Sequence, residues 1–225
     1  MRVRDAAVVH RRSDAWTAIA AAGATALAAW AVAGGTVGAF ERSVFRLVNG
    51  LPDGLRPFLY GFQLLGVLGA PLVLAAGALA LRWWRLALGL VLLVPAKLLV
   101  EKEVLKAAVR RERPGTTIPD AVLRDVPSAG PSFPSGHAII VFGIVVLIAP
   151  YLRHRWQLLL AVALAVLNSV ARVYLGAHAP LDVVGGAFAG IAIGALLNFV
   201  LGVPGPGPPV AGRTGAAHGR DAGDG

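Results

Sequence analysis

The chain has 225 residues, of which 56% are hydrophobic and only 15% charged. A soluble domain would carry about a quarter charged residues, so this composition favours a membrane protein with several spans. The net charge of +9 does not require a nucleic-acid partner, because Lys and Arg gather in cytoplasmic loops of membrane proteins, and we expect no such partner.

A basic N-terminus, residues 1–15, precedes an Ala-rich, uncharged stretch over residues 16–40. That stretch exceeds the apolar region of a signal peptide, about 7–15 residues, and predicts a retained first span. Residues 41–58 contain turn signals and predict an interfacial loop with a short helix over residues 44–49. A second span is expected over residues 60–81, before a basic turn with two tryptophans.

The third predicted span begins near Leu86 and becomes charged after Lys97, while it keeps helical spacing. Its basic residues recur at i, i+4 and i+7, which predicts that one face of the emerging helix carries Lys106, Arg110 and Arg113. Pro114 predicts the end of this helix. Residues 116–133 show no periodicity and predict a polar loop.

Three more spans are predicted over residues 135–151, 156–174 and 181–203. In the last of them glycine recurs at every fourth position, which predicts close packing on another helix through Gly186, Gly190 and Gly194. Residues 204–225 are rich in Gly and Pro and predict a disordered tail.

These elements predict an all-α fold, a six-span helix bundle that forms one domain over residues 16–203. An even number of spans puts both termini and the basic turns on one side, which the positive-inside rule makes cytoplasmic. The protein is then a multi-pass cell-membrane protein. The loop after the third span faces outward although it is basic, and anion binding is one reason for such a departure.

Three clusters fall at this outward face. Lys106 and Arg113 can both donate to a phosphate, although a basic helix end stabilised by the helix dipole is an equally simple interpretation. In the second cluster, Ser135 is an N-cap candidate and Gly136 allows close approach of a ligand to a helix N-terminus. A plain helix start is the alternative there, but His137 at a membrane edge is typical of a functional residue.

The third cluster contains Arg172, His178 and Asp182. His178 and Asp182 are four residues apart, so a helix or a turn can bring the carboxylate to the imidazole and fix its tautomer. Arg172 lies near the end of an apolar span, where a charge costs about 2.5–3.5 kcal/mol. An ion pair between Arg172 and Asp182 is the structural alternative.

Together these residues resemble the signature of the type 2 phosphatidic acid phosphatase family: Lys-x6-Arg-Pro, Pro-Ser-Gly-His and Ser-Arg-x5-His-x3-Asp. The three parts match Lys106 to Pro114, Pro134 to His137, and Ala171 to Asp182, with Ala171 where the family usually has Ser. The resemblance implies that His178 is a nucleophile that forms a phosphohistidine, that Asp182 orients it, and that His137 is the general acid. It also implies that the phosphoryl group is bound by Lys106, Arg113, Ser135, Gly136 and Arg172.

The expected function is therefore hydrolysis of a lipid phosphate or diphosphate at the outer membrane face, without a metal or other cofactor. A polyprenyl diphosphate or phosphatidic acid is the favoured substrate. A phosphotransferase that uses an acceptor alcohol and a non-enzymatic transporter remain alternatives. A zinc hydrolase built on His137, His178 and Asp182 is disfavoured, because the surrounding cations would repel a dication.

Overall fold

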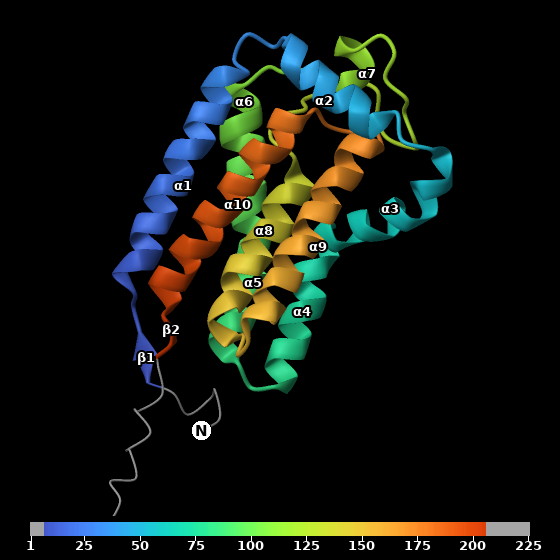
Figure 1. The fold of residues 1–225 in the computed structure, drawn as a ribbon. Coiled ribbons are helices and arrows are strands. Elements are labelled where there is room, and N and C mark those ends of the chain that lie inside the picture. The colour runs from blue at the N-terminus through green and yellow to red at the C-terminus, as the bar shows by residue number, and fades with distance from the viewer. Residues whose placement is uncertain (1–6, 206–225) are drawn as a thin grey trace, which may run out of the picture.

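The computed structural model describes residues 7–205, and the predicted tail from residue 206 onward lies outside them. The chain forms an elongated bundle of helices (Figure 1). The helices are α1 Arg12–Ala31, α2 Ala39–Asn49, α3 Arg56–Gln63, α4 Gly69–Ala80, α5 Trp84–Leu98, α6 Lys106–Ala108, α7 Pro114–Thr117, α8 Gly136–Ile148, α9 Arg155–Tyr174 and α10 Pro180–Leu201. A π-helical segment, Leu99–Leu105, joins α5 to α6.

The helical fold predicted from composition and periodicity is confirmed, but the structure adds one short β-ribbon. Strands β1 (Val8–Val9) and β2 (Val203–Pro204) pair antiparallel, and the Gly205 N–H donates to the Ala7 carbonyl at 2.7 Å. The ribbon ties the segment before α1 to the end of α10. Sequence periodicity cannot reveal a pair of two-residue strands this far apart.

Helix α8 lies at the centre of the bundle, against α5, α9 and α10 (Figure 1). The predicted close packing of the α10 glycines is confirmed: a Cβ on Gly190 would lie 2.3 Å from the Ile139 carbonyl oxygen, and one on Gly194 would lie 2.9 Å from the Gly143 carbonyl oxygen. Around this contact Leu90 and Leu93 of α5 are fully buried. This close approach packs the backbone of α10 against that of α8.

Three helices of the described chain are long and apolar enough to cross a membrane: Arg12–Val32, Arg155–Tyr174 and Pro180–Leu201. A fourth span results if the bent pair Asp53–Gly66 and Gly69–Ala80 counts as one. The apolar helix over Gly136–Tyr151 is shorter. The count of six spans therefore remains a prediction.

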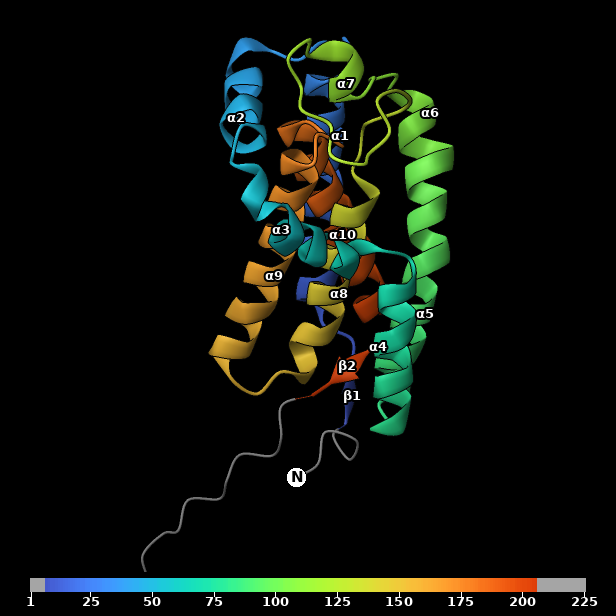
Figure 2. The same ribbon diagram turned by 90° about the vertical axis from the view of Figure 1, so that its right-hand side faces the viewer.

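Two predicted spans have different bounds in the structure. The first helix ends at Ala31, and residues up to 40 do not continue it: Val32 already leaves the helical conformation (φ −107°, ψ 3°), and Gly35 is left-handed (φ +72°). The second predicted span is broken by a bend of 64°. Its first part, α3, runs across the bundle (Figure 2). The predicted short helix over residues 44–49 is longer and begins at Ala39.

The predicted common face for Lys106, Arg110 and Arg113 is wrong. Helix α6 ends at Ala108, and Val109 is already extended (φ −113°, ψ 103°), so Arg113 reaches the site on a non-helical segment. Pro114 does not end a helix but begins α7, because proline is well suited to the first position of a helix.

The basic turns after α4 and after α8 lie at the same end of the bundle as β1 and β2 (Figure 1). Helices α2, α6 and α7 lie at the opposite end. In Figure 2, α5, the π-helical segment and α6 form one rod that joins the two ends. The three sequence clusters are thereby collected near the α2–α7 end.

Candidate active site

His178 lies in the turn between α9 and α10. Pro180 begins α10, and Asp182 in its first turn accepts a hydrogen bond from the Ala179 N–H at 2.8 Å. His178 and Asp182 are therefore joined by a turn rather than by a continuous helix. The His178 Nδ1 lies 3.8 Å from Asp182 Oδ2, which is too long for a hydrogen bond.

Ser132 connects this pair, although the sequence pattern did not indicate it. Its hydroxyl donates to Asp182 Oδ2 at 2.5 Å and lies 3.5 Å from His178 Nδ1. Ser132 belongs to the aperiodic loop before α8, and only the folded chain brings it here. The contact directs Nδ1 of His178 toward Ser132 and Asp182, so Nε2 is the nitrogen that remains for chemistry.

Arg111 holds the other side of the Asp182 carboxylate. Its side chain is fully buried and donates to Asp182 Oδ1 at 2.9 Å and to Glu41 Oε2 at 2.5 Å. Glu41 also accepts a hydrogen bond from the Leu181 N–H at 2.9 Å. The alternative ion pair between Arg172 and Asp182 is thus wrong, since Arg111 takes that place.

Arg113 and Arg172 have no carboxylate within 4.0 Å among residues 7–205. Arg113 donates to the Ala177 carbonyl at 2.8 Å, next to His178, and Arg172 donates to Gln63 Oε1 at 2.5 Å. Arg172 is buried. Two guanidinium groups without a carboxylate partner can both donate to an anion.

The start of α8 meets the start of α10 through the backbone. The Ser135 N–H donates to the Asp182 carbonyl at 2.9 Å, and a Cβ on Gly186 would lie 2.5 Å from the Ser135 carbonyl oxygen. Ser135 occupies the predicted N-cap position, but its side chain makes no capping hydrogen bond. Its buried hydroxyl has no hydrogen-bond partner within the described chain.

Lys106 completes the cluster through Glu101, which the sequence analysis did not single out. The Lys106 Nζ donates to Glu101 Oε1 at 2.6 Å, and Lys97 pairs with the other carboxylate oxygen. Both oxygens would lie 2.7 Å from a Cβ on Gly136. The 97–106 segment therefore brings two lysines and one carboxylate to the start of α8.

The charge state of His178 follows from its surroundings. It is 3% exposed, and burial lowers its pKa from the ordinary 6.5 to about 4, an effect that Asp182 opposes and Arg172 and Arg113 reinforce. The imidazole is consequently neutral at neutral pH.

Ala171, which replaces the serine of the family signature, is fully buried in an apolar cluster with Leu59, Tyr174 and Leu175. A hydroxyl at this position would enter apolar surroundings. Within the described residues, no three His, Asp or Glu side chains converge in the way that a metal ion requires.

Two apolar cavities lie between helices of the bundle. One of about 580 Å³ runs between α4, α8 and α9, where its lining includes Leu65, Val67 and Ile144. Two of its lining residues, Leu65 and Val67, flank Gly66, and a Cβ on Gly66 would lie 2.7 Å from the His137 Cβ.

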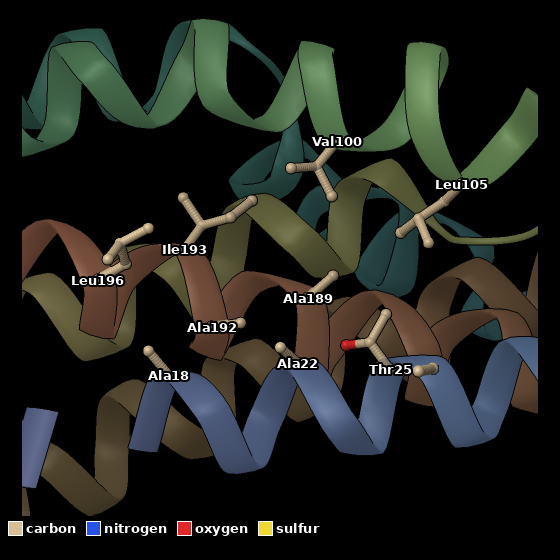
Figure 3. A pocket seen from close by; sticks show the side chains of 10 residues that line it. Ala18, Ala22, Thr25, Val100, Leu105, Ala189, Ala192, Ile193 and Leu196 are labelled. Atoms are coloured by element: carbon tan, nitrogen blue, oxygen red, sulfur yellow. The ribbon is translucent and has the colours of Figure 1, made fainter. Parts of the chain in front are cut away.

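The other cavity, of about 320 Å³, lies between α1, α10 and the π-helical segment (Figure 3). Ala22 and Ala189 line it from below, and Val100 and Leu105 from above. The Thr25 hydroxyl is also at its wall, but it is engaged with the Ala21 carbonyl at 2.9 Å.

Several known proteins are similar to this chain. An undecaprenyl-diphosphatase of Sulfolobus acidocaldarius is 36% identical over 99 residues, which are 44% of this chain and 45% of the relative. A lipid A 4'-phosphatase of Bacteroides thetaiotaomicron is 41% identical over 71 residues, 32% of each chain. The matching region thus spans less than half the length of either relative.

Among solved structures, a transmembrane PAP2-type phosphatidylglycerolphosphate phosphatase of Bacillus subtilis superposes with a TM-score of 0.66. It is 25% identical, and the match covers 81% of this chain and 94% of that one. The sequence profile of the PAP2 superfamily matches residues 73–201, which include every residue of the three clusters. On this evidence, the chain belongs to the PAP2 superfamily.

Proposed function

We propose that this protein is a membrane-bound lipid phosphatase that hydrolyses a lipid phosphate or diphosphate through a phosphohistidine. The observation that carries the proposal is the neutral, buried His178, oriented by Ser132 and Asp182 and flanked by two arginines without counter-ions. Arg113 and Arg172, with Lys106, Ser135 and Gly136, are the proposed phosphoryl-binding groups.

In the proposed first step, Nε2 of His178 attacks phosphorus while the bond from phosphorus to the leaving oxygen breaks. His137 donates a proton to that oxygen, and the alcohol or lipid monophosphate departs. In the second step, water attacks the phosphohistidine, the phosphorus–nitrogen bond breaks, and His137 takes the proton from the water. Asp182 and Arg111 act on His178 from the opposite side and do not touch the phosphoryl group.

The larger cavity supports a lipid as the substrate. His137 protonates the leaving oxygen, so the lipid part of the substrate must lie on the His137 side of phosphorus. The cavity that begins beside Gly66 lies on that side and is apolar along α4, α8 and α9. A hydrocarbon tail in this cavity would bury its apolar surface. The phosphate headgroup of the same lipid could then reach Arg113 and Arg172.

We further propose six membrane crossings over residues 16–203, with the site on the outer face and both termini in the cytoplasm. The basic turns gathered at the opposite end of the bundle support this orientation (Figure 1). Here α3–α4 is one bent crossing, and α5 to α6 is another.

The test is phosphate release by the purified, detergent-solubilised protein in the presence of EDTA. A polyprenyl diphosphate and phosphatidic acid are compared as substrates at equal mole fraction in the micelle. Release undiminished by EDTA is expected, because the proposed chemistry uses no metal, and the ratio of the two rates identifies the preferred headgroup. Loss of phosphate release in EDTA would contradict the proposal, and so would the absence of release from both lipids. In the second case, transfer of the phosphoryl group to acceptor alcohols would be tested next.

The pH dependence of kcat/KM gives a separate prediction. Activity requires neutral His178, so it is lost as pH falls through the pKa of this group, which burial lowers to about 4. The substrate phosphate itself takes up a proton near pH 6, and the pH profile of kcat/KM is corrected for this ionisation. In the corrected profile, the fall of kcat/KM on the acid side should occur well below pH 6.5. A corrected acid limb near 6.5 would show that the nucleophile is a histidine with an ordinary pKa.

A further inference from the structure

Glu101 is a buried carboxylate inside a cationic site, and the proposed mechanism does not use it. It is 5% exposed and lies in the π-helical segment between α5 and α6. Such segments are rare and are frequent at functional sites. One of its oxygens pairs with Lys97, which is itself buried, and the other pairs with Lys106.

The Glu101 carboxylate lies where the proposed function places the substrate phosphate. Both oxygens lie against Gly136, the first residue of α8, at 2.7 Å from the place of a missing Cβ. A helix N-terminus and a lysine are the partners that a phosphate requires. Glu101 therefore pairs with Lys106 and lies against Gly136, two of the residues that the proposed function assigns to the substrate phosphate.

Two anions cannot share these groups at low cost. Unit charges about 4 Å apart repel by about 1 kcal/mol in bulk water and by about 4 kcal/mol near a protein surface. When a phosphate takes Lys106, the Glu101 side chain has to withdraw. Lys97, one helical turn earlier, allows the withdrawing carboxylate to keep a counter-ion.

We propose that Glu101 is an internal anion that competes with the substrate phosphate for Lys106 and the start of α8, and thereby lowers the affinity of the site for phosphate. The inference rests on the proposed function, because it requires phosphate to bind at this place. Any phosphate that binds there, whether a monoester or the terminal group of a diphosphate, has to displace the same carboxylate.

Equilibrium binding tests this without turnover. Inorganic phosphate and pyrophosphate are titrated into the purified protein in detergent, followed by calorimetry, for the wild type, Glu101→Gln and Glu103→Gln. Glu103 lies in the same segment but is exposed. Its substitution therefore removes one negative charge, as Glu101→Gln does, but leaves the carboxylate beside Lys106 and Gly136 in place. We expect Glu101→Gln to bind phosphate about tenfold more tightly, in keeping with the loss of a nearby like charge.

The same substitution should also tighten pyrophosphate binding, and Glu103→Gln should leave both affinities unchanged. Unchanged or weaker phosphate binding by Glu101→Gln would overturn the inference and make Glu101 only a counter-ion for two lysines. If Glu101→Gln does not fold, Glu101→Asp serves instead, because its shorter side chain retreats from Gly136 and should also tighten phosphate binding. Absence of binding in wild type and variants alike would argue against the proposed function itself.

Discussion

Replacement of His178 by alanine should abolish phosphate release while the protein remains folded. We expect kcat to fall by at least about 10⁴-fold, the order of effect seen when a covalent nucleophile is removed. Within residues 7–205, the one hydrogen-bonding contact of the imidazole is the long one with Ser132, at 3.5 Å, so no strong hydrogen bond is lost with the ring. Single-turnover measurements with a lipid phosphate labelled with ³²P, followed by an alkaline quench, should show labelled protein in the wild type and none in the variant.

His154→Ala is the matched control. His154 is exposed in the turn before α9, at the end of the bundle remote from the site (Figure 1). It should retain full activity. Activity of His178→Ala within tenfold of the wild type, or a labelled His178→Ala protein, would contradict the assignment of the nucleophile.

Replacement of Arg111 by methionine should destabilise the protein more than any substitution among the phosphate-binding residues. The change leaves Glu41 and Asp182 buried, close together and without their shared cation. Removal of one partner from a buried ion pair costs about 3–5 kcal/mol. We expect the free energy of unfolding in mixed micelles, measured by titration with a denaturing detergent, to fall by this amount.

Arg110→Met is the control, since Arg110 is adjacent but exposed, and such a change should remain within about 0.5 kcal/mol. Equal destabilisation by the two substitutions would show that the Arg111 bridge contributes nothing specific. Glu41→Gln in the Arg111→Met background should restore part of the lost stability, because it removes one of the two carboxylates left unpaired.

Much of the site could be predicted because its parts are local. The Pro-Ser-Gly-His sequence marks the start of α8, and the glycine period in α10 predicts a close contact that the structure confirms. His178 and Asp182 are four residues apart, so any compact turn brings them close. Local spacing and composition are enough for such features.

Other features depend on contacts between distant segments, which spacing does not encode. Helical periodicity placed Lys106 and Arg113 on one helix, but the helix ends at Ala108, and the fold brings Arg113 to His178 on an extended segment. The bend after α3 was also not predicted, because the composition of an apolar stretch does not indicate whether its helix is straight or bent.

By itself, the sequence determined the membrane class, the helical content and the identity of the residues in the three clusters, because hydrophobic length and short motifs are properties of neighbouring residues. Only the tertiary structure decided which charges pair: Arg111, rather than Arg172, with Asp182, and Glu101 with Lys97 and Lys106. A buried charge is stable only beside a suitable partner. Which residue becomes that partner depends on how helices that are distant in the sequence pack against one another.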